Sequence, residues 1–248
     1  VPEGVDPADW QTTTDDMVAM NTADLVLING AGYESWLETV SLAAEDVVDT
    51  SAGFKDRLIE TGGRVHSHGP DGSHSHAGTA THTWMDPDLA ILQAEAVLKA
   101  LVALTPADQE RMQSNFGVLR RDLVERSAGL EQAVNAAPAT PVLFSHPVYQ
   151  YLQRRYRMNG HSVHFEPDVD PDPAAMAELG VLLAANPTTW CVWEGTPSDG
   201  NAAMLRNRGI RSVVFDPGGS PPASGDLLDL IDVGIASFRT VYGATDDS

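Results

Sequence analysis

Short apolar segments alternate with longer helical segments along most of the chain, and this alternation limits the possible folds more than any other feature. The runs VLIN, VLFS, CVW and SVVF are apolar at consecutive positions, which is typical of parallel strands covered by helices on both faces. The pattern therefore predicts an α/β fold with mainly parallel sheets. We expect strands at 23–29, 141–145, 162–166, 190–194 and 211–216, and helices at 13–21, 87–104, 147–157, 173–185, 198–208 and 225–242.

One expected helix, from Thr105 to Asn135, is much longer than the others. Thr105 is a natural N-cap, Pro106 stands at the tolerated first helical position, and Pro138 ends the segment. Such a helix is a rod of roughly 45 Å, which either joins two domains or packs along a single sheet. Its apolar residues recur at intervals that keep one helical face apolar: Met112, Phe116, Leu119, Leu123, Leu130 and Val134.

The chain of 248 residues has 35 acidic and 15 basic side chains, a formal net charge of −20. Nucleic acid and anionic lipid are bound through Lys and Arg, so this charge argues against both as partners. It suits a protein that handles cations, or simply a solvated acidic surface. The sequence contains no run of roughly 18 to 20 apolar residues, the length that a membrane span needs. Because its start lacks the layout of a signal peptide, we expect a cytosolic chain or the mature or trimmed form of an exported one.

The eight histidines fall into two groups, five between positions 66 and 82 and three at 146, 161 and 164. Four of the first group lie in the Gly- and Ser-rich segment 62–81, which we expect to be a surface loop: His66, His68, His74 and His76. Neutral imidazole is the commonest metal ligand, so this loop is expected to capture metal weakly; the alternative is a solvated polar linker or a cloning tag.

Polar side chains also follow the apolar runs. His146 comes after VLFS, Asp216 ends SVVFD, and Glu194 ends CVWE, while His82 opens the motif HTWMDP before the helix at 87–104. The carboxyl ends of strands are where ligands bind in open α/β sheets. Two imidazoles and one carboxylate suit Zn²⁺, and the two acids compete for the carboxylate role. We interpret His161 and His164 as structural or peripheral.

Several ordered motifs resemble the metal-binding solute-binding proteins of ABC transporters (cluster A-I), and within them the zinc-specific branch. They are VPEGVDPADW, ADLVLINGAGYESWL, the His-rich insert, HTWMDP, VLFSHPVYQYLQRRY and VVFDPGG, and together they cover essentially the whole chain. The resemblance implies two α/β domains, 1–104 and 138–248, joined by a rigid helix within 105–137, with metal in the cleft between them. It also implies that His82, His146 and Asp216 are the metal ligands, which favours Asp216 over Glu194. A histidine at position 146 favours zinc over manganese.

Two departures from the family pattern affect the expected site. The family's first histidine falls on Ala8, which binds no metal, so the site is completed by water, by Asp9 or by a loop histidine. The family's N-terminal strand, helix and strand have no counterpart ahead of Val1, so we expect an incomplete first domain.

The resemblance implies an extracytoplasmic, monomeric zinc-binding protein that captures Zn²⁺ and delivers it to an ABC transporter permease, without catalysing a reaction. Two alternatives remain open at this stage. A degenerate or truncated relative would bind metal only weakly. A zinc hydrolase would need a general base beside the metal-bound water, for which the motifs offer only Asp9 or Glu194.

Overall fold

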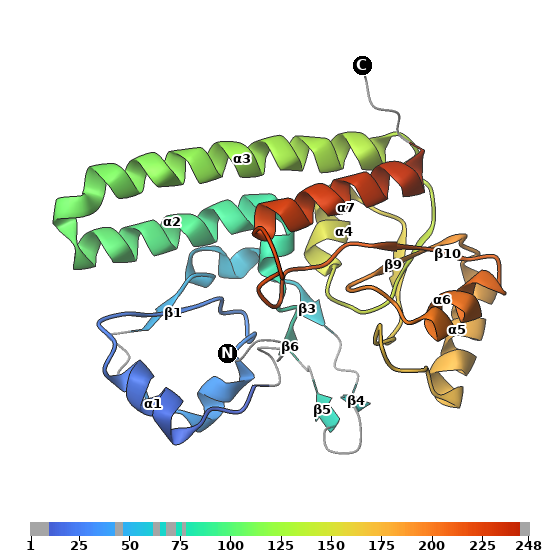
Figure 1. Ribbon diagram of the computed structural model, residues 1–248, viewed down its shortest axis with the longest axis horizontal. Coiled ribbons are helices and arrows are strands. Elements are labelled where there is room, and N and C mark those ends of the chain that lie inside the picture. The colour runs from blue at the N-terminus through green and yellow to red at the C-terminus, as the bar shows by residue number, and fades with distance from the viewer. Residues whose placement is uncertain (1–9, 43–46, 62–64, 68–72, 76–77, 244–248) are drawn as a thin grey trace. The chain divides into compact units, whose positions relative to one another are not determined.

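The computed structural model describes residues 10–42, 47–61, 65–67, 73–75 and 78–243 (Figure 1). The chain divides into two compact units, Val1–Val124 (unit 1) and Glu125–Ser248 (unit 2), and the division falls inside the long helix α3 (Gln109–Asn135). Helices alternate with parallel strands in both units, so the predicted α/β class is confirmed.

Unit 1 contains short strands, one 18-residue helix and the first part of α3, up to Val124. Its parallel pair joins β1 (Val26–Ile28) to β2 (Val47–Asp49), and the 18-residue helix α2 (Pro87–Leu104) packs against β2. The remaining elements are α1 (Thr14–Asn21), η1 (Ser35–Thr39), η2 (Ala52–Arg57), β3 (Glu60–Thr61), β4 (Val65–Ser67), β5 (Ser73–Ser75), β6 (Gly78–Thr79), η3 (Thr83–Met85) and η4 (Pro106–Asp108).

A tight turn follows β1 in the motif NGAGYE. The Glu34 carboxylate accepts hydrogen bonds from the backbone N–H groups of Asn29 and Gly30, at 2.6 and 3.0 Å. Gly30 has φ of +79°, and a Cβ there would collide with the Asp49 carboxylate, so only glycine fits. The glycines of this motif therefore serve a turn that Glu34 closes.

Unit 2 is built on a four-stranded sheet in the order β10-β9-β7-β8, in which every neighbouring pair is parallel. The strands are β7 (Val142–Phe144), β8 (Gly160–Ser162), β9 (Trp190–Trp193) and β10 (Arg211–Val214). The helices of this unit, apart from the end of α3, are α4 (Gln150–Tyr156), α5 (Pro173–Ala185), α6 (Asp199–Arg206) and α7 (Leu227–Tyr242).

Helices cover both faces of this sheet, because alternate side chains of its central strands enter two different clusters. Leu143 and Cys191 face a core that includes Leu179 of α5 and Leu205 of α6 (orange in Figure 1). On the other face, aromatic rings link the sheet to α4 and α7. Phe144 contacts Tyr149 at the start of α4, and Phe215 contacts Phe238 of α7, with ring centroids 4.8 and 5.3 Å apart.

The long helix begins differently from the expectation. Residues 106–108 form the 3₁₀ turn η4, and α3 runs on from Gln109 to Asn135. The Thr105 side chain makes no capping bond, and its hydroxyl instead donates to the carbonyl of Leu101 in α2. Thr105 and Pro106 therefore occupy the predicted N-cap and first positions, but of η4 and not of α3, and the Thr105 hydroxyl bonds back to α2 instead of capping the turn.

The segment 62–81 also contains more regular backbone than a loop. Within the described residues, β4 pairs with β5 antiparallel, and β3 pairs with β6.

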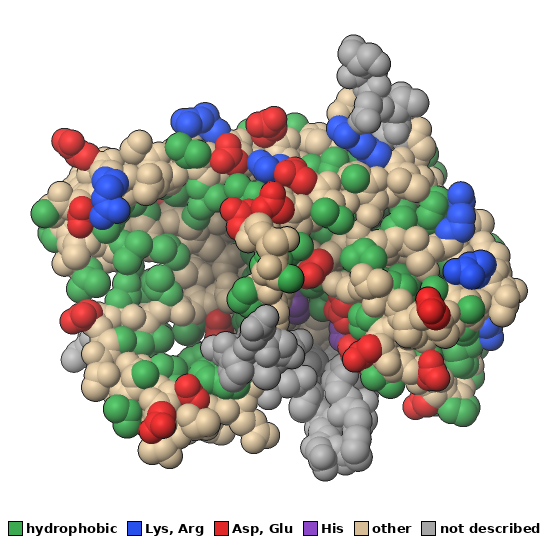
Figure 2. Space-filling view, viewed as in Figure 1, with side chains coloured by type: hydrophobic (Ala, Val, Ile, Leu, Met, Phe, Trp, Pro, Cys, Tyr) green, Lys and Arg blue, Asp and Glu red, His purple; other side chains and the backbone are tan. Residues whose placement is uncertain are grey.

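Among the described residues, no helix is both long and apolar enough to cross a bilayer. Acidic side chains occur over most of the molecular face drawn in Figure 2, mixed with basic ones.

Candidate metal centre

Four polar side chains of unit 2 follow the carboxyl ends of the four parallel strands. His146 stands two residues after β7, Glu194 directly after β9, Glu166 four residues after β8, and Asp216 two residues after β10. Because the strands are parallel neighbours, these ends meet at one edge of the sheet, where α/β proteins bind ligands.

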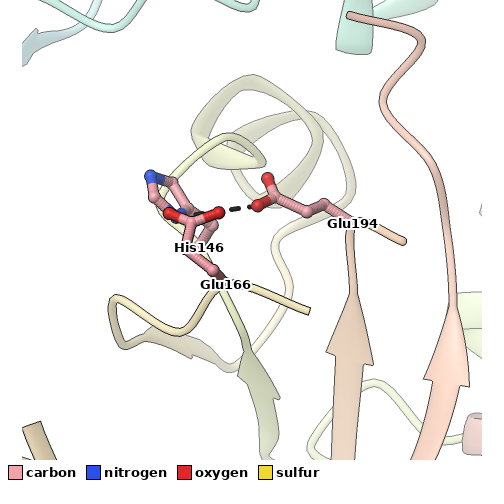
Figure 3. A group of neighbouring side chains, drawn as sticks. All are labelled: His146, Glu166 and Glu194. Carbon is pink, nitrogen blue, oxygen red and sulfur yellow. Dashed lines mark ion pairs between the residues drawn. The ribbon is translucent and has the colours of Figure 1, made fainter. Parts of the chain in front are cut away.

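Three of these side chains point toward one another (Figure 3). His146 Nδ1 lies 3.4 Å from Glu166 Oε1 and 3.7 Å from Glu194 Oε1, and one ligand atom of each residue falls within 4.8 Å of the other two. The side chains of His146 and Glu194 are 16% and 20% exposed, and that of Glu166 is 37% exposed. The cluster is thus partly sheltered from water and still open to an ion.

Ser145 fixes the backbone at all three strand ends. Its carbonyl accepts from Phe165 N–H at 2.7 Å, its hydroxyl accepts from Glu194 N–H at 3.3 Å, and its own N–H donates to Val192. Ser145 is fully buried. The residue before His146 therefore ties together the segments that carry Glu166 and Glu194, which holds the three side chains in register.

The loop after Glu166 is held by one buried amide. Asn201 in α6 donates through Nδ2 to the carbonyls of Glu166, Pro167 and Val169, at 3.0 to 3.1 Å. Asn201 is 1% exposed, so these bonds are shielded from competing water. They anchor this irregular backbone segment and so fix the backbone position of Glu166.

Asp216 lies at the same edge but outside the three-residue cluster. Its Oδ1 accepts from Gly218 N–H at 2.8 Å, which closes the turn after β10. Burial raises the pKa of the nearby Tyr149 hydroxyl well above its usual range, and the charges of Glu194 and Asp216 raise it further. The charges of both acids therefore reach the same buried Tyr149 hydroxyl, which donates a hydrogen bond of 2.6 Å to the Phe215 carbonyl.

His82 belongs to unit 1 and is positioned by aromatic and hydroxyl contacts. Its ring lies 4.9 Å from that of Trp84 and 5.5 Å from that of Tyr33, between ring centroids. Its Nδ1 is 3.0 Å from the Thr81 hydroxyl. If Nδ1 donates this hydrogen bond, the imidazole presents Nε2 as its metal-binding nitrogen.

The loop residues are only partly within the described structure. The β4–β5 ladder pairs His66 with His74 directly, whereas His68, His76 and Asp9 lie outside the described residues, as does Ala8.

The sequence pattern did not identify Glu166 as a candidate ligand, and His164 was interpreted as structural or peripheral. The His164 ring contacts that of His146 edge-on, with centroids 5.5 Å apart. A signal for Glu166 was present: like Asp216, it is the last residue of an expected strand and precedes a proline.

The comparisons with known proteins agree on the family and the fold. Over 242 residues the chain is 22% identical to "High-affinity zinc uptake system protein ZnuA" of Yersinia pestis, covering 89% of this chain and 75% of that protein. "Iron-binding protein YfeA" of the same organism is 28% identical over 158 residues, 62% of this chain, and the match spans about half (47%) of YfeA.

Solved structures give the same fold. The "Zn(II)-bound ZnuA-like domain of Streptococcus pneumoniae AdcA" superimposes with a TM-score of 0.80 at 17% identity, over 97% of this chain and 88% of that one. The family model described as "ZnuA: Zinc-uptake complex component A periplasmic" matches residues 1–241. This chain therefore belongs to the ZnuA family of zinc-uptake components.

Proposed function

We propose that this protein captures Zn²⁺ outside the cytoplasmic membrane and delivers it to an ABC transporter permease. The observation that carries the proposal is the position of His146, at the carboxyl edge of a parallel sheet and facing two carboxylates. The match to the zinc-uptake family over residues 1–241 supports the same activity.

The family match favours zinc over the iron named in one relative, and the donors at the edge are compatible with zinc. An imidazole nitrogen with carboxylate oxygens makes a mixed donor set that zinc accepts in tetrahedral geometry. The proposed action is ligation and release: the ion displaces any proton on His146, and no covalent bond of a substrate changes.

His146 is the ligand that this proposal depends on most. His82 of unit 1 is proposed as the second imidazole, and the edge of the sheet supplies the carboxylate, from Asp216 as the resemblance implies or from Glu194. The two expected domains, 1–104 and 138–248 with a connecting helix in 105–137, remain part of the proposal, as does a monomeric protein.

A zinc titration against a competing chelator at neutral pH tests the proposal. The unaltered chain should show one tight site, which disappears in His146→Ala and weakens in His82→Ala. His161→Ala is the matched control, because His161 lies in β8 of the same sheet. Only weak sites that persist in His146→Ala would contradict the proposal and leave the histidines of 62–81 as the binding groups.

Delivery needs a separate test in cells. Deleting the gene should raise the zinc concentration required for growth, and the unaltered gene should restore growth where the His146→Ala gene does not. Equal restoration by both genes would contradict a role for this site in uptake.

A further inference from the structure

We propose that the outer edge of β10 binds an extended, acidic segment of a partner protein, which adds a fifth strand to the sheet of unit 2. β10 is the end strand in the order β10-β9-β7-β8, and among the described strands it pairs only with β9. The surface includes Trp190 and Arg211, the first residues of β9 and β10. It therefore lies toward the amino ends of these strands, away from the edge that carries His146, and the proposal goes beyond zinc capture.

The backbone of β10 turns one set of hydrogen-bonding groups away from β9. At both ends of the strand an odd-numbered residue donates to the β9 segment, through Arg211 N–H and Phe215 N–H. Backbone groups alternate along a strand, so those of Ser212 and Val214 point outward. The Val214 carbonyl accepts from the Ser237 hydroxyl of α7 at 2.6 Å, which leaves the N–H and C=O of Ser212 to pair with an added strand.

This edge lies in an open groove of about 440 Å³ between α6 and α7 (the β10 groove). Arg206 lines the groove from α6, and Thr240 lines it from α7. Arg211 lies on the α7 side, because its guanidinium stacks 3.7 Å over Trp190, whereas the next residue, Cys191, faces α5 and α6. The groove therefore has a wall on each face of the sheet, and it occupies the place beside β10 where a fifth strand would run.

Charge selects an acidic partner. Residues 206–211 read Arg-Asn-Arg-Gly-Ile-Arg, with three arginines and no acid, in a chain that has 35 acidic and 15 basic side chains. Among the described residues these three arginines form no ion pair, whereas Arg126 pairs with Asp232. Figure 2 shows basic side chains over α6 and β10. A peptide fits this surface better than a nucleic acid, because a peptide can continue the backbone ladder.

The two walls also set the spacing of the acidic residues. Adjacent residues of an added strand point to opposite faces of the sheet. Because Arg206 stands on the α6 wall and Arg211 on the α7 wall, two consecutive carboxylates reach both, whereas carboxylates two residues apart face the same wall. The lining of the groove is mostly apolar, so we expect apolar residues beside the acidic pair.

Fluorescence polarisation of labelled peptides with the full chain tests the proposal. The peptide Thr-Val-Glu-Glu-Val-Thr should bind about fivefold more tightly than Thr-Val-Glu-Val-Glu-Thr, which has the same composition but loses one of the two ion pairs. The peptide with Lys in place of both Glu residues should not bind. Equal affinity for the two acidic peptides, or no binding of either, would overturn the proposal.

Charge variants locate the binding surface. Arg206→Gln and Arg211→Gln should each weaken binding of the Glu-Glu peptide about fivefold. The control Arg120→Gln alters an exposed arginine of α3 and should leave binding unchanged. Unchanged binding in both groove variants would overturn the proposal.

A backbone variant tests the added strand directly. Ser212→Pro removes the outward N–H and should weaken binding at least about tenfold, and proline is tolerated on an edge strand where its nitrogen faces away from the sheet. Ser212→Ala is the matched control: both variants lose the hydroxyl that accepts from Trp193 Nε1, but only Ser212→Pro loses the N–H. Equal affinity in these two variants would contradict an added strand.

Two further measurements separate this proposal from the alternatives. Far-UV circular dichroism should show that all the variants fold, and each should bind zinc like the unaltered chain. A chain that binds the peptide but no zinc would refute the proposed function alone. Light scattering should show no self-association through the groove; a dimer lost in Arg206→Gln and Arg211→Gln would assign the groove to a second copy and overturn the proposal.

Discussion

The strand β1 of unit 1 reads Val-Leu-Ile and β7 of unit 2 reads Val-Leu-Phe, and each is three residues long. Leu27, at the centre of β1, is 40% exposed, whereas Leu143, at the centre of β7, is fully buried. Among the described strands β1 pairs only with β2, while β7 lies between β9 and β8 and is covered by helices. Burial of these two leucines is therefore set by what surrounds the strand and not by its own sequence.

His146 and His82 also differ in how much surrounding structure holds each side chain. His146 is placed by a buried sheet whose strand ends are cross-linked through Ser145. His82 is placed by rings and a hydroxyl around the short turn η3. We expect changes in the core of unit 2 to cost more stability than equivalent changes in unit 1, in the order of the following predictions.

The largest difference is expected between the two leucines. Leu143→Ala should lower the free energy of unfolding by about 2–5 kcal/mol, because it leaves a cavity in a packed core. Leu27→Ala should cost less than about 1 kcal/mol, since much of that side chain already contacts water. Urea unfolding of both variants measures the difference, and equal losses would show that burial does not separate the two units.

A second pair compares two helical glycines. A Cβ at Gly234 of α7 would lie 2.5 Å from atoms of the buried Phe215 ring, so Gly234→Ala should cost about 1–3 kcal/mol. At Gly117 of α3, no atom of the described residues beyond the helix's own backbone lies within 4 Å of the Cβ position, so Gly117→Ala should gain about 0.5–1 kcal/mol. Thermal unfolding checks both, and a stabilising Gly234→Ala would contradict the packing described here.

A third pair tests buried hydroxyls within unit 2. Tyr149 donates to the Phe215 carbonyl, so Tyr149→Phe should cost about 1 kcal/mol. Tyr242 Oη is buried and has no hydrogen-bond partner among the described residues, so Tyr242→Phe should be neutral or slightly stabilising. Urea unfolding of the two variants would contradict this if Tyr242→Phe cost as much as Tyr149→Phe.

The smallest effect concerns pH and the turn of unit 1. Burial raises the pKa of Glu34 above its usual 4.5, against the lowering effect of the Asn29 and Gly30 hydrogen bonds. The folded chain then holds this proton at pH values where the unfolded chain has lost it. Stability should therefore fall as pH rises from 4.5 through the folded-state pKa.

Glu34→Gln should flatten that part of the stability curve, measured by urea unfolding across the acid range. Glu38→Gln, which alters an exposed residue of η1, controls for the loss of one negative charge. A slope unchanged in Glu34→Gln would assign the pH dependence to other groups.

The sequence predicts much of the fold where local signals agree. Helices α2 and α5 have the predicted bounds, because Asp86-Pro87 and Asp172-Pro173 supply both an N-cap acceptor and a proline at the first helical position. β8 begins at Gly160, two residues before the predicted strand, because its pairing to β7 provides a partner that local propensity does not show.

The candidate site was only partly predictable. The rule that ligands bind at the carboxyl ends of strands singled out His146, Glu194 and Asp216, each at the end of its own expected strand. Glu166 was missed because it stands four residues beyond β8, and its position depends on Ser145 and on the distant Asn201. Its place at the end of an expected strand and before a proline marks Glu166 as a candidate, but no local pattern shows that it lies beside His146 and Glu194.

The most direct test of the central claim is anomalous diffraction at the zinc edge, from crystals of the full chain grown with one equivalent of zinc. The account predicts the strongest anomalous peak about 2.1 Å from His146, at the carboxyl edge of the β10-β9-β7-β8 sheet. A strong peak only at the histidines of residues 62–81, with none beside His146, would contradict it.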